Sequence, residues 1–201
     1  MRWWLVVWMC GCFAGILSAE TFVEPIQYLN ETSAQAMSAL PGAQLYRINM
    51  TDASDPACPD PGWDYEYFAP SKASNGTAGW KKITVTLSEQ SQKGSCSMIW
   101  SQHSDDTDTP IFGTLPLEAA LQAPHLTLAD AFNIMQSHFF HPLTLKSGEI
   151  VKSDVDHGPI FTYILFGEVC GQPTDMSIDA GTGVVVDAPQ PPSCPDGIRA
   201  N

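Results

Sequence analysis

The sequence is poor in basic residues, and this limits the partners that it can bind. Lys and Arg together number 9 against 22 Asp and Glu, which gives a net charge of −13. Such an excess of negative charge repels nucleic acid and anionic lipid surfaces, so neither is expected as a partner. It favours a cationic partner, and we expect that partner to be a protein.

Recognisable catalytic motifs are also lacking. The sequence holds no G-x-S-x-G, no H-E-x-x-H and no phosphate-binding loop. His138 and His141 have a spacing that could share a metal, but no Cys or carboxylate lies near them, and two polar residues at a helix end are favoured. The acidic run at Asp105, Asp106 and Asp108 lacks the Gly and the distant Glu of a calcium loop. We therefore predict no catalytic residues, no metal and no cofactor.

A run of apolar residues long enough to cross a membrane is missing as well. Met1 and Arg2 precede an apolar stretch from Trp3 to Leu17, which is shorter than the roughly 20 residues that a spanning helix needs. Ser18-Ala19 supplies small residues for cleavage, so residues 1–19 are predicted to be a secretory signal peptide. A lipoprotein signal with Cys12 as the lipidated residue is the less favoured alternative. The mature chain is expected to be periplasmic or secreted, without a membrane span.

The mature chain keeps four cysteines and has no C-x-x-C pair, so a zinc ribbon or a thioredoxin-like redox site is not indicated. Four cysteines in an exported chain predict two disulfides, for which three pairings are possible. We favour Cys58 with Cys96 and Cys170 with Cys194, because the members of each pair lie in the same half of the sequence.

The sequence predicts three helices and eight strands. The first helix covers residues 30–40, with Ala34, Met37 and Leu40 on one face, and a short second helix covers residues 115–123 and ends at Pro124. The third begins at Thr127, with Asp130 as a partial capping box. Its apolar stripe is Leu128, Ala131, Phe132, Met135 and Phe139. The predicted strands cover residues 44–50, 63–67, 80–87, 95–102, 149–156, 160–168, 175–179 and 184–187.

The two halves of the sequence share the order of these elements, which is consistent with an internal duplication. We therefore predict an α+β fold of two similar units, each with one helix packed on an antiparallel β-meander. The first unit would cover residues 20–114 and the second residues 115–187. A proline-rich tail, residues 188–201, would follow.

Residues 127–187 resemble a PepSY domain. The resemblance is carried by the Ala-Asp-Ala-Phe segment at 129–132, an Ile/Val strand, a Phe/Tyr strand and the hairpin Asp-Ala-Gly-Thr-Gly at 179–183. It implies an exported bacterial protein that binds and restrains enzymes such as proteases rather than catalysing a reaction. Asp179, Thr182 and Gly183 would then form a turn, with Gly181 or Gly183 at positive φ.

The aromatic residues on the predicted strands allow two interpretations. Alternation with charged neighbours favours core packing, whereas exposed aromatic side chains would form a binding surface. The residues concerned are Trp63, Tyr65, Tyr67, Trp80 and Trp100. We expect an exported, non-enzymatic binding or regulatory protein, which restrains a protease or another envelope protein. The alternative is a small secreted hydrolase whose site is assembled from both halves, and the oligomeric state stays open.

Overall fold

The computed structural model describes residues 24–51, 57–58, 61–72, 78–93, 95–107, 117, 121, 124–139, 141, 143–152, 161–192 and 194. The predicted signal peptide, residues 1–19, lies outside them. The N-terminal half forms the 3₁₀ helix η1 (Pro25–Tyr28), helix α1 (Leu29–Ala39) and strands β1 (Gln44–Thr51), β2 (Gly62–Lys72), β3 (Ala78–Gln92) and β4 (Ser95–Thr107). The C-terminal half forms helix α3 (Leu128–Phe139) and strands β5 (Leu143–Lys152), β6 (Phe161–Val169), β7 (Gln172–Asp179) and β8 (Val185–Asp187).

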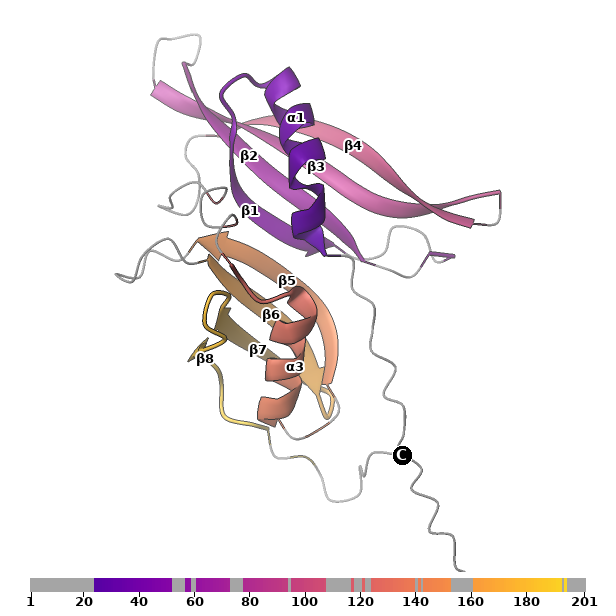
Figure 1. Cartoon of the computed structure of the whole chain (residues 1–201), viewed down its shortest axis with the longest axis vertical. Coiled ribbons are helices and arrows are strands. Elements are labelled where there is room, and N and C mark those ends of the chain that lie inside the picture. The colour runs from indigo at the N-terminus through magenta and orange to yellow at the C-terminus, as the bar shows by residue number, and fades with distance from the viewer. Residues whose placement is uncertain are drawn as a thin grey trace, which may run out of the picture.

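All eight strands belong to one continuous antiparallel sheet in the order β4-β3-β2-β1-β5-β6-β7-β8 (Figure 1). The predicted fold of two separate helix-on-meander units is therefore wrong. The two halves are joined because β1 pairs with β5 through Arg47–Val151, Ile48–Ile150 and Asn49–Glu149. This pairing removes two strand edges that separate units would leave exposed.

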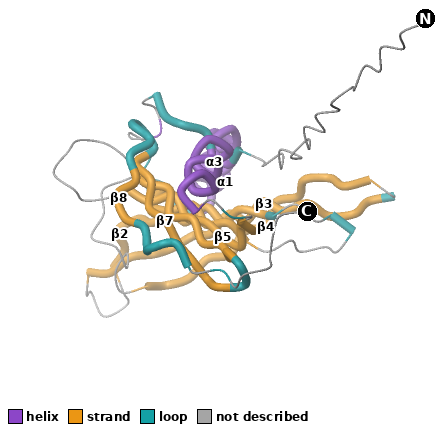
Figure 2. The backbone as a smooth tube through the Cα atoms, turned by 90° about the horizontal axis from the view of Figure 1, so that it is seen from below, coloured by secondary structure: helices purple, strands orange, loops and turns teal. Residues whose placement is uncertain are grey.

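Both helices cover the same face of the sheet, as Figure 2 shows. Ile48 pairs with Tyr65 on one side of the β1–β5 seam, and Ile150 pairs with Tyr163 on the other. Directly paired residues share a face, and all four side chains are buried. The buried residues of both halves form one hydrophobic cluster between the sheet and the helices.

Helix α3 agrees with its sequence prediction. The Thr127 Oγ1 accepts from the Asp130 N–H at 3.1 Å, and the Asp130 carboxylate accepts from the Thr127 N–H at 3.1 Å, which is a reciprocal capping box. The whole predicted apolar stripe is buried. The helix therefore begins where its capping residues place it.

Helix α1 buries a different face from the predicted one. Met37 is 48% exposed, whereas Thr32 and Ala36 are completely buried. The Thr32 Oγ1 lies 2.7 Å from the Tyr67 Oη, and this buried polar contact fixes the rotation of the helix. Apolar spacing alone missed it because the contact residue is a Thr.

No helix within the described part of the chain is long and apolar enough to span a membrane.

Candidate functional site

Three of the five strand aromatics pack in the core, as the favoured interpretation expected. Trp63, Tyr65 and Tyr67 are 1%, 0% and 0% exposed, so the interpretation of these three as a binding surface is wrong. The Tyr65 Oη donates to the Pro25 carbonyl oxygen at 2.7 Å, which anchors η1 on the sheet. Burial raises the pKa of the Tyr65 hydroxyl, so it stays a hydrogen-bond donor.

Trp80 and Trp100 are partly exposed, but the structure places them on opposite faces. The Trp80 ring packs against Tyr46, with centroids 6.2 Å apart, and Tyr46 packs against Phe68 at 5.4 Å. This aromatic trio lies on the face without helices. Trp100 instead packs against Tyr28 at 5.8 Å on the helix-covered face. The five aromatics therefore form no common binding platform.

The helix-free face carries an ion-pair network beside the aromatic trio. Arg47 pairs with Glu149 across the seam and approaches Glu66, with 4.0 Å between the Nη1 and Oε2 atoms. Lys82 reaches the same Glu66 carboxylate at 3.4 Å. The network thus balances charges across β5, β1, β2 and β3, and its partly buried position lets it contribute more than a fully solvated pair would.

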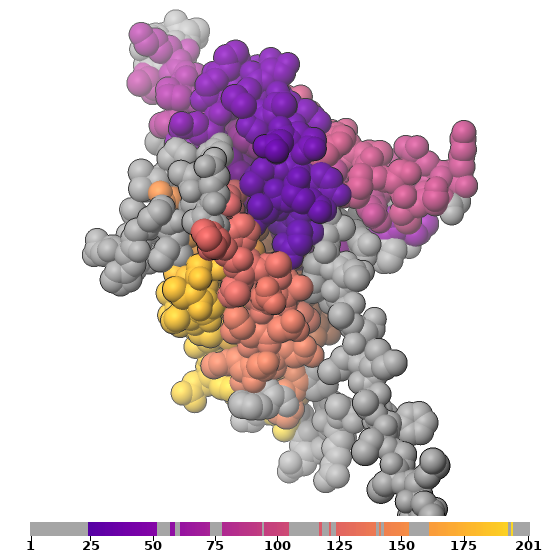
Figure 3. Space-filling model, viewed as in Figure 1, coloured from indigo at the N-terminus to yellow at the C-terminus, as the bar shows by residue number. Residues whose placement is uncertain are grey.

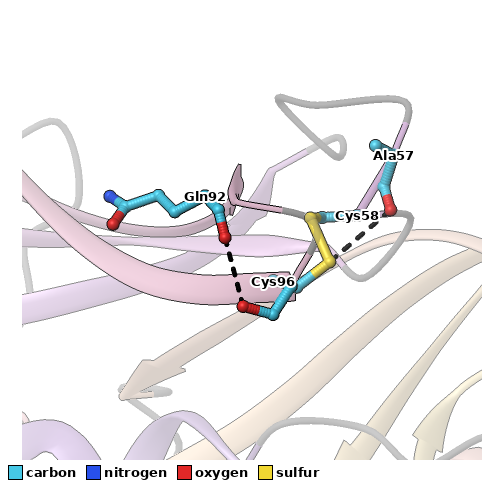
Figure 4. The surroundings of a disulfide bond; sticks show 5 residues. Ala57, Cys58, Gln92 and Cys96 are labelled. Atoms are coloured by element: carbon cyan, nitrogen blue, oxygen red, sulfur yellow. Dashed lines mark hydrogen bonds between the residues drawn. A yellow bond between two sulfur atoms is a disulfide. The ribbon is translucent and has the colours of Figure 1, made fainter.

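Both predicted disulfides are present. Cys58 is bonded to Cys96, with their Cα atoms 5.7 Å apart, and Cys170 to Cys194, with their Cα atoms 5.6 Å apart. The second bond ties the predicted tail to the loop between β6 and β7. The first ties a loop to β4, and the Cys96 sulfur lies 3.5 Å from the Ala57 carbonyl oxygen (Figure 4).

The disulfides also account for the groups of metal-ligand residue types. His141 lies beside Cys170 and Cys194, and Glu89 lies beside Cys58 and Cys96. In each group the two cysteines are bonded to each other, so neither supplies the thiolate that a metal requires.

The metal-ligand candidates that the sequence offered, but that were not favoured, have separate environments. The His138 ring packs edge-on against the Phe139 ring, with the ring centroids 5.1 Å apart. His138 lies at the end of α3, as predicted. The structure describes the backbone of Asp105 and Asp106 but not their side chains, and Asp108 lies outside the described residues.

The predicted turn residues form the expected hairpin turn. The Asp179 Oδ1 accepts from the Thr182 N–H at 2.7 Å and from the Thr182 hydroxyl at 2.8 Å. Gly183 adopts φ 74°, and a Cβ there would lie 3.1 Å from the Leu126 side chain. Thus Gly183 meets both a backbone requirement and a close approach to the start of α3. These residues are structural.

A projecting hairpin was missed by the sequence analysis. The last β2–β3 pair is Trp63–Leu87, yet β3 continues to Gln92 and pairs with β4 down to Gln92–Ser95. We call residues 88–93 and 95–99 the arm. It extends away from the body of the molecule beside α1 (Figures 1 and 3). The arm is polar, so its strands lack the apolar alternation that indicates a strand. The hairpin could have been inferred from Lys93-Gly94, a pair suited to a tight turn, between two polar stretches.

A disulfide attaches the arm to another part of the chain, and local contacts close its tip. The Cys58–Cys96 disulfide attaches it to a loop whose Cys58 is completely buried. At the tip, Lys93 has φ 53° and the Ser95 hydroxyl donates to the Gln92 carbonyl oxygen at 3.1 Å. The arm is therefore a fixed projection whose side chains at Gln90, Gln92 and Lys93 are exposed.

The two outer strands of the sheet differ in how their edges are protected. Strand β8 has three residues and is followed closely by Pro189, Pro191 and Pro192. Strand β4 has 13 residues, pairs with β3 without a register shift, and has no charged residue or proline in residues 95–104. Short length, prolines, bulges and charges are common protections of sheet edges; β8 has the first two, and residues 95–104 of β4 have none of the four.

Comparisons with known proteins do not identify the chain. No protein-family profile matches it. No curated protein matches it either. A provisionally assigned lipoprotein from Clostridium difficile 630 has a solved structure that is 9% identical, covers 80% of this chain and 90% of that chain, and aligns with a TM-score of 0.48. A similarity of this size carries no conclusion about function, and the PepSY resemblance stays a prediction.

Proposed function

We propose that this chain is an exported, non-enzymatic protein that binds another polypeptide through the arm and strand β4. The observation that carries the proposal is the arm, which extends past the last β2–β3 pair and is fixed by a disulfide. A fixed projection loses little conformational entropy when a partner docks, so more of the contact energy is available for affinity.

Export is supported by the two disulfides. Such bonds persist in oxidising compartments and are rare where thiols are kept reduced. The predicted signal peptide would direct the chain to such a compartment. Periplasmic and secreted locations both fit this chemistry.

A cationic partner is favoured by the charge of −13. Opposite charges accelerate the encounter and are screened by salt, so association should slow as ionic strength rises. The PepSY resemblance of residues 127–187 suggests what this binding does: it restrains a protease or another envelope protein.

Photo-crosslinking in cells that export the protein tests the proposal. A photoreactive amino acid would replace Gln92 in the arm or, as a matched control, Gln172 at the start of β7. Both are exposed glutamines, but they lie in opposite halves of the sheet. We expect a discrete protein adduct at Gln92, several times stronger than at Gln172 and weaker at high salt. Equal adducts at both positions, or an adduct at Gln172 alone, would contradict the proposal.

A further inference from the structure

Strand β4 forms one outer edge of the eight-stranded sheet. In an antiparallel strand, alternate residues direct their N–H and C=O groups to opposite sides, so half of these groups in β4 face away from β3. Among the described strands, β4 pairs with β3 alone. Its 13 residues pair with β3 in register without a bulge, which gives a template much longer than the three-residue strand at the other edge.

From this edge we infer that β4 accepts an extended, non-acidic segment of a partner polypeptide as an additional antiparallel strand of the sheet. The inference rests on the proposed function and specifies its binding mode. Main-chain hydrogen bonds would supply affinity, and side chains beside β4 would supply selectivity.

Charge decides between a different polypeptide and a second copy of this chain. Each copy carries −13, and Asp105 and Asp106 lie near the C-terminal end of β4. Two copies that met at this edge would bring together like-charged molecules, which is unfavourable. A segment with Lys or Arg at one end would instead place its positive charge near the acidic end of β4.

Strand β3 shows which side-chain pattern fits β4. On the inner edge, Lys82 pairs with Asp105 and Leu87 pairs with Trp100. An added strand with the same pattern and orientation would repeat both pairings on the outer edge. Its counterpart of Leu87 would then cover Trp100, which is only partly buried.

A peptide copy of β3 is therefore a defined probe. Residues 81–88, Lys-Lys-Ile-Thr-Val-Thr-Leu-Ser, would be synthesised with a fluorophore, together with a control peptide of scrambled order. Fluorescence polarisation with the full mature protein should show saturable binding of the β3 peptide and at least tenfold weaker binding of the control. Absence of saturation up to about 1 mM, a weak affinity for a specific complex, would overturn the inference.

Two proline variants locate the binding edge. In adjacent residues the N–H groups point to opposite edges, so one of Ser101→Pro and Gln102→Pro removes an outward N–H and the other removes a bond to β3. The outward variant is the one that keeps the melting temperature, and it should bind the peptide at least tenfold more weakly. Ser101→Ala and Gln102→Ala keep both N–H groups and should bind as the unchanged protein does.

Unchanged peptide binding by the well-folded proline variant would overturn the inference. If both proline variants unfold, slower hydrogen exchange of the β4 amides with bound peptide supports the inference, and unchanged exchange overturns it.

The outcomes separate this inference from the broader proposal. A protein adduct at Gln92 without peptide binding to β4 would leave the proposed function standing and remove the added-strand mode. Peptide binding to β4 without an adduct at Gln92 in cells would show a competent edge but contradict the proposed cellular role of the arm.

Discussion

Arg47 on β1 forms an ion pair with Glu149 on β5, diagonally across the seam that joins the two halves of the sheet. The seam has three residue pairs, far fewer than the ladders beside it. Leu45 lies nearer the start of β1 than the three residues that pair with β5. There the Leu117 N–H donates to the Leu45 carbonyl oxygen at 2.7 Å. Side-chain and backbone contacts thus reinforce a short strand pairing.

The ion pair should contribute measurably to the seam. We expect a coupling of about 1 kcal/mol between Arg47→Met and Glu149→Gln, because both side chains are partly buried. A double-mutant cycle of urea unfolding measures it. The pair Lys146 and Glu168 is a more exposed control, with side chains 53% and 46% exposed, and should give a smaller coupling. Equal couplings would show that the seam position adds nothing.

The buried hydroxyl of Tyr65 should stabilise the N-terminal segment. Tyr65→Phe leaves the Pro25 carbonyl oxygen without its donor and should lower the free energy of unfolding by about 1–2 kcal/mol. The corresponding change Tyr163→Phe removes a 2.9 Å bond to the Leu126 carbonyl oxygen and should cost a similar amount. Chemical denaturation of the two variants tests this, and stability losses near zero would mean that water replaces the hydroxyls.

Glu24 should make the protein less stable as pH rises. Its carboxylate accepts from the Leu128 N–H at the start of α3, at 2.8 Å. Burial raises the pKa of Glu24 above 4.5, more than the Ala129 and Leu128 N–H groups lower it. The folded state therefore binds more protons than the unfolded state between these two pKa values, and this stability is lost as pH rises through the folded pKa. Glu24→Gln should remove that loss and melt higher than the unchanged protein at pH 7, with little difference at pH 4. A lower melting temperature at pH 7 would contradict the sign.

Asp130 at the same helix end should show the opposite pH dependence. Hydrogen bonds from the Thr127 hydroxyl and N–H lower the pKa of Asp130 below 3.8. Its contribution is therefore present above pH 3.8 and is lost as pH falls through the folded pKa. Asp130→Asn should melt lower than the unchanged protein at pH 7, and the difference should shrink in acid. A difference that grows in acid would contradict this assignment.

The Cys58–Cys96 disulfide should stabilise the fold and hold the arm. Loop closure over a separation of 38 residues corresponds to about 4 kcal/mol. The paired change Cys58→Ser with Cys96→Ser should lower the unfolding free energy by up to that amount and speed hydrogen exchange in residues 88–99. The paired change at Cys170 and Cys194 should destabilise without changing exchange in the arm. Equal arm exchange in both variants would show that the first disulfide does not hold it.

Local features of the fold were predictable because neighbouring residues determine them. Thr127 and Asp130 cap α3, Asp179 and Thr182 close their turn, and alternating apolar residues indicate the strands. Strand β5 was predicted to begin at Glu149, but it begins at Leu143. A register shift between Leu145 and Ser147 interrupts the alternation on which the prediction relied.

The continuous sheet was not predictable from the same patterns. Alternation shows which face of a strand is buried, but it does not show which strand lies beside it. Ile48 and Ile150 pair across about half the chain, and nothing local distinguishes this pairing from two separate meanders. The arm was missed for the converse reason, because neighbouring strand residues such as Gln90 and Ser91 place polar side chains on both faces.

The most direct measurement compares partner crosslinking with and without the arm. Glu89 pairs with Met98, so an Asn-Gly turn in place of residues 90–97 would close a shorter hairpin. Because this replacement removes Cys96, the shortened protein also carries Cys58→Ser. The paired change Cys58→Ser with Cys96→Ser, with the arm intact, controls for the lost disulfide. With a photoreactive residue at Gln102 in each protein, we predict that shortening the arm reduces the partner adduct at least tenfold relative to this control. An undiminished adduct in a shortened protein that still melts cooperatively would contradict the central claim that the arm binds the partner.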